Sequence, residues 1–252
     1  MKAYCYVDIG PGKANCDDRV LINNSVIAAG LYSIELPDDR TVSLAVADGV
    51  GGSKAGYYAA TQAVSALSES LLPTDLSVQS VIHLINEANW RIIALSNDDI
   101  RLSGMATTLS GLCHEGNHWF LYHVGNTRVY VWAFGSLNQL TEDHTWIRKM
   151  QLVGFGEGEL SQSARQSEIN ACLGGGNMQL AEKLQVLDVS NIIGDAQRIL
   201  ITSDGLHDYI QHSALEASME GIGDVEDYFR QAIDFARESG SKDDISILMV
   251  DL

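Results

Sequence analysis

The chain has 252 residues, of which 46% are hydrophobic and 19% are charged, and its formal net charge is −17. So much negative charge argues against a nucleic-acid partner, because the phosphates would repel such a surface. No apolar run approaches the roughly 18 residues of a membrane span, and the N-terminus lacks the apolar region of a signal peptide. We expect a single domain over residues 1–252, cytoplasmic, monomeric and without a membrane partner.

The first part of the chain is typical of β-strands. Residues 3–9, 25–35 and 41–47 are rich in β-branched and aromatic side chains and are bounded by turn residues. The segment 37–40 (Pro-Asp-Asp-Arg) is a turn sequence between two apolar runs. The second and third strands are therefore predicted to form a hairpin.

Helical periodicity replaces this pattern in the next part of the chain. Apolar residues recur at helical spacing over 59–71, ahead of Pro73, and again over 78–92, behind the cap candidates Thr74 and Ser77. Two consecutive helices are predicted.

Strand character then returns and persists to the end of the chain, with one further helix. Strands are predicted over 107–113, 119–123, 128–134, 198–202 and 245–250, and a helix with a clear apolar stripe over 225–236, started by Asp224 and stopped by Gly240. Residues 153–180 have little periodicity and are predicted to form a long surface loop. Blocks of strands separated by helices favour antiparallel sheets packed together with helices outside them.

Acidic residues stand at the edges of several predicted strands, so a fold could gather them at one sheet edge. Each of the short segments has an ordinary explanation by itself, since Asp-Gly is common in turns and Asp-Asp is usually solvated. Together they suit hard divalent cations, which prefer oxygen ligands, and two such ions about 3.5–4 Å apart would clamp a phosphoryl group. The segments are Asp17-Asp18, Asp48-Gly49, Ser203-Asp204-Gly205 and Lys242-Asp243-Asp244. The scattered Cys5, Cys16, Cys113 and Cys172 form no CxxC pair, which argues against a zinc site or a disulfide framework.

The order of these motifs resembles the metal-dependent serine/threonine protein phosphatases of the 2C type (the PPM family), in their short bacterial form. The similarity is carried by residues 8–18 (D-x-G-x-x-R-x-x-N-E-D), 46–52 (V-A-D-G-M-G-G), 104–108 (G-M-G-T-T), 123–130 (H-V-G-D-S-R-x-Y), 140–144 (L-T-x-D-H), 203–208 (S-D-G-L-x-D) and 242–246 (x-D-N-I-T). It covers nearly the whole chain. The implied fold is of the α+β class: a four-layer αββα sandwich, in which two antiparallel β-sheets are flanked by helices.

The resemblance also implies roles for individual residues. Asp48 would bridge two Mg²⁺ or Mn²⁺ ions, with the Gly49 carbonyl on one of them. Asp204 and Asp243 would complete one ion's ligands, and Asp17 and Asp18 would hold the other, directly or through water. A water or hydroxide between the ions would attack phosphorus directly, and Lys13 would bind the phosphate. The substrate would be a phosphorylated protein, opposed by a serine/threonine kinase in bacterial signalling.

Some residues depart from the family pattern. Lys13 stands in place of an arginine and cannot offer its bidentate fork, and Ser53 replaces a histidine. Asn126 replaces an aspartate that helps to hold a third metal together with Asp208, so we expect a third site that is weak or empty. The region 153–180 aligns with the family's variable flap beside the catalytic cleft.

Two other functions stay open at this stage. A catalytically weak relative would act as a binding or signalling adaptor, and another two-metal phosphohydrolase would act on small phosphoesters. The surviving acids favour the enzyme. His123 and His144 are interpreted as residues that pack or orient turns, His207 as one that points to solvent or orients its loop, and Arg128 as the partner of an acidic neighbour.

Overall fold

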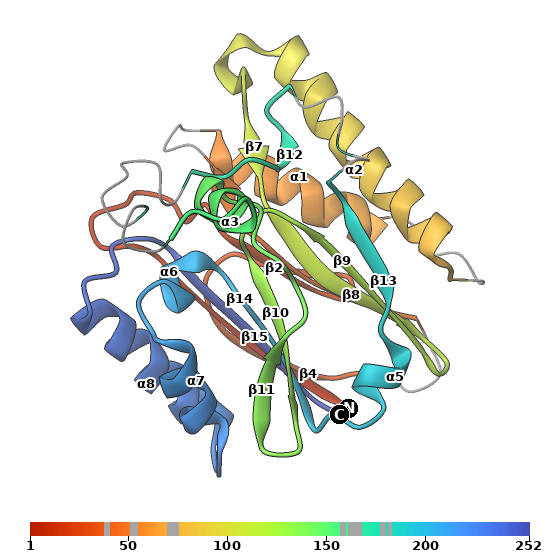
Figure 1. Cartoon of the computed structure of the whole chain (residues 1–252). Helices are drawn as coiled ribbons and strands as arrows, with labels where there is room; N and C mark the ends of the chain where they lie inside the picture. The colour runs from red at the N-terminus through yellow and green to blue at the C-terminus, as the bar shows by residue number, and fades with distance from the viewer. Residues whose placement is uncertain are drawn as a thin grey trace.

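The computed structural model describes residues 1–37, 41–50, 55–69, 76–156, 160, 168–176, 180 and 183–252. Two six-stranded antiparallel sheets form its centre (Figure 1). In spatial order, the first sheet contains β11 (Ser136–Gln139), β10 (Arg128–Ala133), β14 (Arg198–Thr202), β15 (Ile245–Asp251), β1 (Lys2–Asp8) and β4 (Gly30–Glu35). The second contains β13 (Gln185–Asp188), β9 (His118–Val124), β8 (Leu109–Glu115), β5 (Val42–Ala47), β2 (Arg19–Ile22) and β3 (Ser25–Ile27). A small third sheet contains β12 (Leu173–Gly174), β7 (Ala106–Thr107) and β6 (Gly49–Val50).

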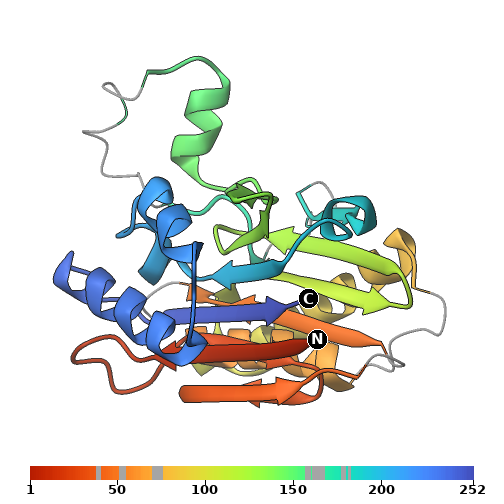
Figure 2. The ribbon, with the colours of Figure 1, turned by 90° about the horizontal axis from the view of Figure 1, so that it is seen from below.

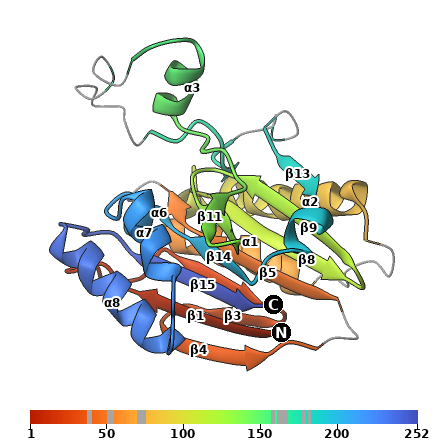
Figure 3. The same ribbon diagram turned by 60° about the horizontal axis from the view of Figure 1, so that its bottom comes forward.

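Helices cover the outer faces of the two large sheets. Packed on the second sheet are α1 (Gly56–Glu69) and α2 (Val78–Asp98), whereas α7 (His212–Met219) and α8 (Val225–Glu238) pack on the first (Figure 3). The remaining helical segments are η1 (Ile100–Leu102), α3 (Trp146–Leu152), α5 (Ser190–Ile193) and α6 (Asp204–His207). The α+β class and the four-layer αββα sandwich predicted from the sequence are confirmed.

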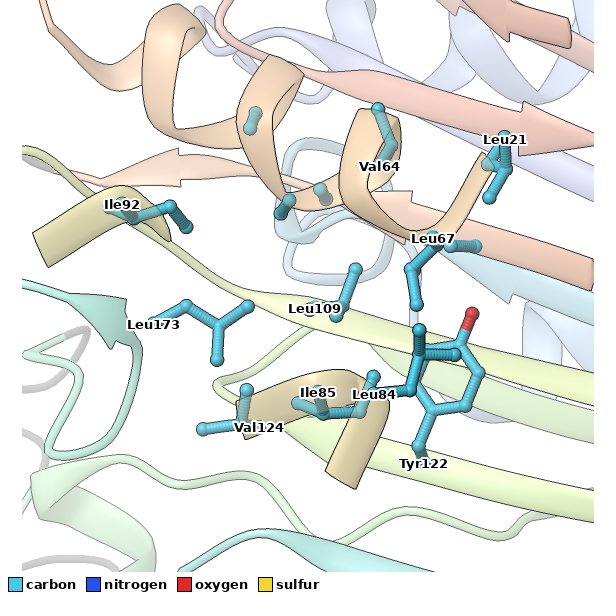
Figure 4. Packing of buried hydrophobic residues seen from close by; sticks show 14 of the residues in the cluster. Leu21, Val64, Leu67, Leu84, Ile85, Ile92, Leu109, Tyr122, Val124 and Leu173 are labelled. Atoms are coloured by element: carbon cyan, nitrogen blue, oxygen red, sulfur yellow. The ribbon is translucent and has the colours of Figure 1, made fainter. Parts of the chain in front are cut away.

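Three buried hydrophobic clusters join the four layers. Val46 of β5, Val131 of β10 and Leu248 of β15 belong to the cluster between the two sheets. Figure 4 shows the cluster beneath the first helix pair, where Leu67 and Ile85 lie with Tyr122 of β9. The third cluster joins α7 and α8 to the first sheet. Alternate residues of a strand can thus face a helix layer and the other sheet, so the strands are buried on both faces.

The predicted hairpin between residues 25–35 and 41–47 is wrong. The first of these segments is divided, because the chain leaves the second sheet after β3 and enters the first as β4, beginning at Gly30 with a φ of 76°. β4 pairs with β1, whereas β5 pairs with β2 and β8. Part of the predicted turn, residues 38–40, lies outside the described residues. Strand β2 was not predicted, although all of its residues are buried.

Helix ends agree closely with the capping signals of the sequence. The Ser77 side chain accepts a hydrogen bond from the Ser80 amide at the start of α2, and Asp224 caps α8 in the same way through Glu226 and Asp227. Gly240, with a φ of 102°, follows the end of α8. The cap candidate Thr74 and much of the predicted loop 153–180 lie outside the described residues. No residue of α3, just before that loop, is buried, and Figures 2 and 3 show this helix standing clear of the sheets.

Within the described residues, no helix combines the length and the apolar character that crossing a membrane requires.

Candidate metal centre

The loops that carry the predicted acids leave the sheets at one end of the sandwich. β1 ends where β15 begins, with Asp8 opposite Ile245, and β5 ends where β2 begins, with Ala47 opposite Arg19. β14 ends at the same end, beside the start of β15. Antiparallel pairing reverses the chain at each strand end, so acidic segments far apart in the sequence meet here.

Asp18 lies at the buried centre of this acidic cluster. It is 1% exposed, and neither of its carboxylate oxygens has a hydrogen-bond partner among the described residues. Burial raises the pKa of Asp18 to about 7; the nearby Ser246 hydroxyl opposes this rise, and the Asp244 charge adds to it. A buried, unpaired carboxylate is costly unless a cation or proton compensates it. This position therefore favours a bound cation.

Asp48, Asp204 and Asp243 are close enough to act on one another's charge. Burial and the charges of Asp18, Asp204 and Asp243 raise the pKa of Asp48 well above its ordinary value. The pKa of Asp204 is likewise raised, by burial and then by Asp243. Like charges in one site disfavour full ionisation. The cluster therefore needs positive charge before all of its carboxylates can ionise together.

The backbone around Asp48 is fixed by hydrogen bonds to the segment before β8. The Asp48 amide donates to Thr108 Oγ1 (3.1 Å), and the Asp48 carbonyl accepts from the Thr108 amide (2.8 Å). The Gly49 amide donates to the Asp17 carbonyl (3.3 Å). A Cβ at Gly49 would collide with the backbone of Gly56 at the start of α1. Only glycine permits this approach, which holds the predicted ligand carbonyl against the helix.

Asp17 lies at the N-terminus of α1. Its Oδ1 accepts a hydrogen bond from the Tyr57 amide (3.0 Å), an arrangement that the helix dipole favours. Burial raises the pKa of Asp17, and the positive charge of Lys13 opposes that rise. Asp17 is thus oriented by α1 rather than by the loop that carries it.

Lys13 reaches the acids that precede β15. Its Nζ lies 2.5 Å from Asp243 Oδ1, 3.0 Å from Asp244 Oδ2 and 3.9 Å from Asp17 Oδ2. Burial lowers the pKa of Lys13, but its hydrogen bonds to the first two acids outweigh that effect and raise it. Asp244, absent from the predicted site, also accepts from the amides of Gly10 (2.7 Å) and Asp17 (2.6 Å). It stands where the family motif has asparagine, which is the signal that it differs in charge.

Asn126 is placed directly against the cluster. Its Nδ2 donates to Asp204 Oδ2 (2.8 Å), and its own Oδ1 is buried without a hydrogen-bond partner among the described residues. Asp208 lies nearby on the exposed side of α6, and burial followed by the Asp204 charge raises its pKa to about 6. The residues predicted for a weakened third metal are therefore neighbours.

The donor chemistry fits Mg²⁺ or Mn²⁺, although the side chains do not converge on a point. Among the described residues, no group of three or more His, Cys, Asp or Glu side chains is arranged to hold an ion by itself. Mg²⁺ usually keeps several waters and uses only one or two carboxylates, so such convergence is not required. The carboxylate oxygens, the orphaned oxygens of Asp18 and the mutually raised pKa values all suit a hydrated divalent cation.

The nearby histidines and Arg128 serve structure. His123 bonds to Ser110 Oγ (2.7 Å) and to a backbone carbonyl, and His144 Nδ1 accepts from the Gly125 amide (3.1 Å). Arg128 forms a two-pronged ion pair with an acidic neighbour, at 2.6 and 2.9 Å. These expectations are confirmed. His207 does not point to solvent, because it is 5% exposed and bonds to the strand-end Thr202.

Comparison with known protein families and sequences agrees with the site. A sequence profile described as "Protein phosphatase 2C" matches residues 31–249. The serine/threonine phosphatase stp of Listeria welshimeri is 26% identical over 84% of this chain and 85% of its own. The protein phosphatase PhpP of Streptococcus pneumoniae is 25% identical over 100% of this chain and 98% of its own. The serine/threonine protein phosphatase PstP of Mycobacterium tuberculosis is 28% identical over 83% of this chain, which spans only 40% of that protein.

Solved structures show the same fold. The crystal structure of PstP from Mycobacterium tuberculosis has a TM-score of 0.78 at 26% identity, covering 100% of this chain and 99% of that one. The serine/threonine phosphatase Stp1 of Staphylococcus aureus has a TM-score of 0.80 at 20% identity, covering 99% and 94%. A PstP catalytic domain in complex with two manganese ions has a TM-score of 0.73 at 24% identity, covering 100% and 99%.

Proposed function

The chain belongs to the protein phosphatase 2C family, and from this premise we propose that its acidic cluster binds two Mg²⁺ or Mn²⁺ ions that hydrolyse phosphoserine and phosphothreonine in proteins. It is an enzyme, a serine/threonine protein phosphatase. The observation that carries the metal proposal is the buried carboxylate of Asp18, without a partner among the described residues and surrounded by further acids. We also propose that residues 1–252 form a single domain of this type.

The residues of the chain would divide the work between holding metal and holding substrate. Asp17, Asp18, Asp48, Asp204 and Asp243, with the Gly49 carbonyl, would hold the ions. When bound, such ions polarise the phosphoryl oxygens and supply a strong nucleophile at neutral pH. The hydrogen bonds from the segment before β8 keep Asp48 in place during turnover.

Substrate binding would fall to Lys13. Its Nζ stands at the edge of the cluster and is partly exposed, so it can donate to a phosphate oxygen without leaving its loop. A positive charge at this place offsets the repulsion between a phosphate and a chain of net charge −17. Asn126 and Asp208 would form a third metal site that is weak or empty, because asparagine contributes no charge.

The biological setting that we propose is bacterial signalling in the cytoplasm, with a serine/threonine kinase as the opposing enzyme and a phosphoprotein as the substrate. The support for it is that the similar proteins are bacterial phosphatases named for serine and threonine. A catalytically weak adaptor or a small-phosphoester hydrolase would be revealed by the assay below.

Hydrolysis of a phosphothreonine peptide tests the proposal. Activity is expected with Mn²⁺, and its loss is expected with excess EDTA and in Asp48→Asn, because the variant removes a metal ligand and its charge. Asp195→Asn is the matched control, since this exposed acid carries the same charge outside the cluster. Full activity in EDTA or in Asp48→Asn would contradict the metal mechanism. A preference for p-nitrophenyl phosphate or nucleotides over the peptide would contradict the substrate class.

A further inference from the structure

Arg237, in the last turn of α8, connects loops that none of the family motifs connects. Its guanidinium Nη2 donates to Asp8 Oδ2 (2.6 Å), and its Nε donates to the same oxygen (3.1 Å). Its Nη1 donates to the carbonyl of Asp243 (2.5 Å) and to that of Ser241 (3.3 Å). One planar side chain thus bridges the end of β1 and the loop that precedes β15.

Each anchor of this bridge lies close to a candidate site residue. Asp8 precedes the turn whose Gly10 amide donates to Asp244 (2.7 Å) and which carries Lys13. Asp243 is itself a candidate ligand, and Arg237 holds it through its backbone, which leaves its carboxylate free to face the cluster. The Arg237 side chain, at 17% exposure, is well shielded from water, so these hydrogen bonds are stronger than exposed ones.

A third loop joins the bridge through Ser241. Its hydroxyl donates to the carbonyl of Gly205 (2.7 Å), the residue after the candidate ligand Asp204, and also lies 3.4 Å from Arg237 Nη1. The loops after β1 and β14 and the loop before β15 are therefore tied to the end of one helix. Thus α8 sets their spacing, although Arg237 itself donates to no carboxylate of the candidate ligands.

We propose that Arg237 is a positioning residue for the metal centre: with Asp8 it sets the distance between the Lys13 loop and Asp243, and so tunes metal affinity. This inference rests on the proposed function. Groups that orient metal ligands typically contribute about 10- to 100-fold to metal affinity. Because the bridge acts before substrate binds, its loss raises the metal dissociation constant while turnover at saturating metal stays close to that of the wild type.

Calorimetric titration with Mn²⁺ alone, without substrate, tests this role. Arg237→Gln is expected to raise the Kd by about 10- to 100-fold, and Arg237→Lys by less, since lysine keeps the charge but loses the fork. Asp8→Asn should have an effect similar to that of Arg237→Gln, and the double variant should be no worse than the weaker-binding single variant, because the two residues act as a unit. A phosphopeptide assay at saturating Mn²⁺ should recover most of the turnover.

The matched control is Arg198→Gln, which breaks another half-buried arginine–aspartate pair of the same sheet, at the opposite end of β15 (Arg198 Nε to Asp251 Oδ1, 2.7 Å). It should lower the melting temperature without changing the Mn²⁺ affinity. An unchanged Kd in both Arg237→Gln and Asp8→Asn would overturn the positioning role, as would an equal loss of affinity in Arg198→Gln. Absence of Mn²⁺ binding in the wild type would instead refute the proposed function.

Discussion

At the scale of single residues, the chain places charge where the fold alone gives no reason for it. A carboxylate such as Asp18, buried without a hydrogen-bond partner among the described residues, destabilises a folded protein unless something compensates it. Asp244, by contrast, accepts two backbone amides and the Lys13 ammonium, so its burial is offset. The difference between these two acids separates a candidate metal ligand from a residue that organises loops.

Lys13 is expected to act on the substrate more than on turnover. Lys13→Ala should raise KM for phosphopeptides with a smaller change in kcat, because it removes the positive charge beside the cluster, whereas Lys13→Arg should retain or improve activity by adding a fork. Steady-state kinetics of both variants, at a metal concentration that saturates each, make the comparison. An unchanged KM in Lys13→Ala would show that its hydrogen bonds to Asp243 and Asp244 are its whole role.

Asn126 allows a test of the third metal site. Asn126→Asp would replace a hydrogen bond to Asp204 by a second negative charge, so the metal-free variant should melt at a lower temperature than the wild type. Added Mn²⁺ should raise its melting temperature by more than it raises that of the wild type, and half-maximal activity should need less metal, because ligand charge increases affinity. Identical metal titrations of both proteins would mean that asparagine serves only the turn that it occupies.

At the scale of elements, the site is made by strand ends and by glycines that allow loops to touch. Gly205, in α6, lies so close to the loop before β15 that a Cβ would collide with the Asp244 carbonyl. Gly49 meets the start of α1 in the same way. The positions of the neighbouring acids thus depend on close backbone contacts that no side chain supplies.

Gly205→Ala should therefore separate α6 from the β15 loop. Overpacking of this kind typically costs about 1–3 kcal/mol of unfolding free energy, and we also expect weaker Mn²⁺ binding, because Asp204 and Asp243 would move apart. Urea denaturation and metal titration measure the two effects. Gly223→Ala is the control, since a Cβ there meets nothing within 4 Å and should change neither quantity appreciably.

At the scale of the whole molecule, a formal charge of −17 accompanies a cluster of acids that hold one another's pKa values high. The folded, metal-free site keeps protons that the unfolded chain has released. These carboxylates therefore stabilise the metal-free fold below their folded pKa values, and that contribution is lost as the pH rises through about 7, the pKa of Asp18. Buried histidines such as His123, with a pKa lowered by burial to about 4, act in the opposite sense below about pH 6.5.

Metal binding should consequently release protons. Between about pH 6 and about pH 8, Mn²⁺ affinity is expected to increase with pH, because bound protons compete with the metal for the carboxylates. Calorimetry in two buffers of different ionisation enthalpy counts the protons released at each pH. The release should shrink at the upper end of the range, where Asp18, with its pKa of about 7, is already ionised. A flat affinity without proton release would contradict the raised pKa values.

The sequence by itself determined the features that neighbouring residues encode. The apolar stripe of α8, the caps Ser77 and Asp224, and the acids beside strand ends are local patterns, and the ordered motifs around those acids pointed to the family and hence to the αββα sandwich. Only the tertiary structure decided which distant segments meet. It divided residues 25–35 between two sheets, because burial on both faces leaves no alternation to indicate the partner strand. It also set Arg237 against Asp8, 229 positions away, since hydrogen bonds at such separations leave no periodic trace in a single sequence.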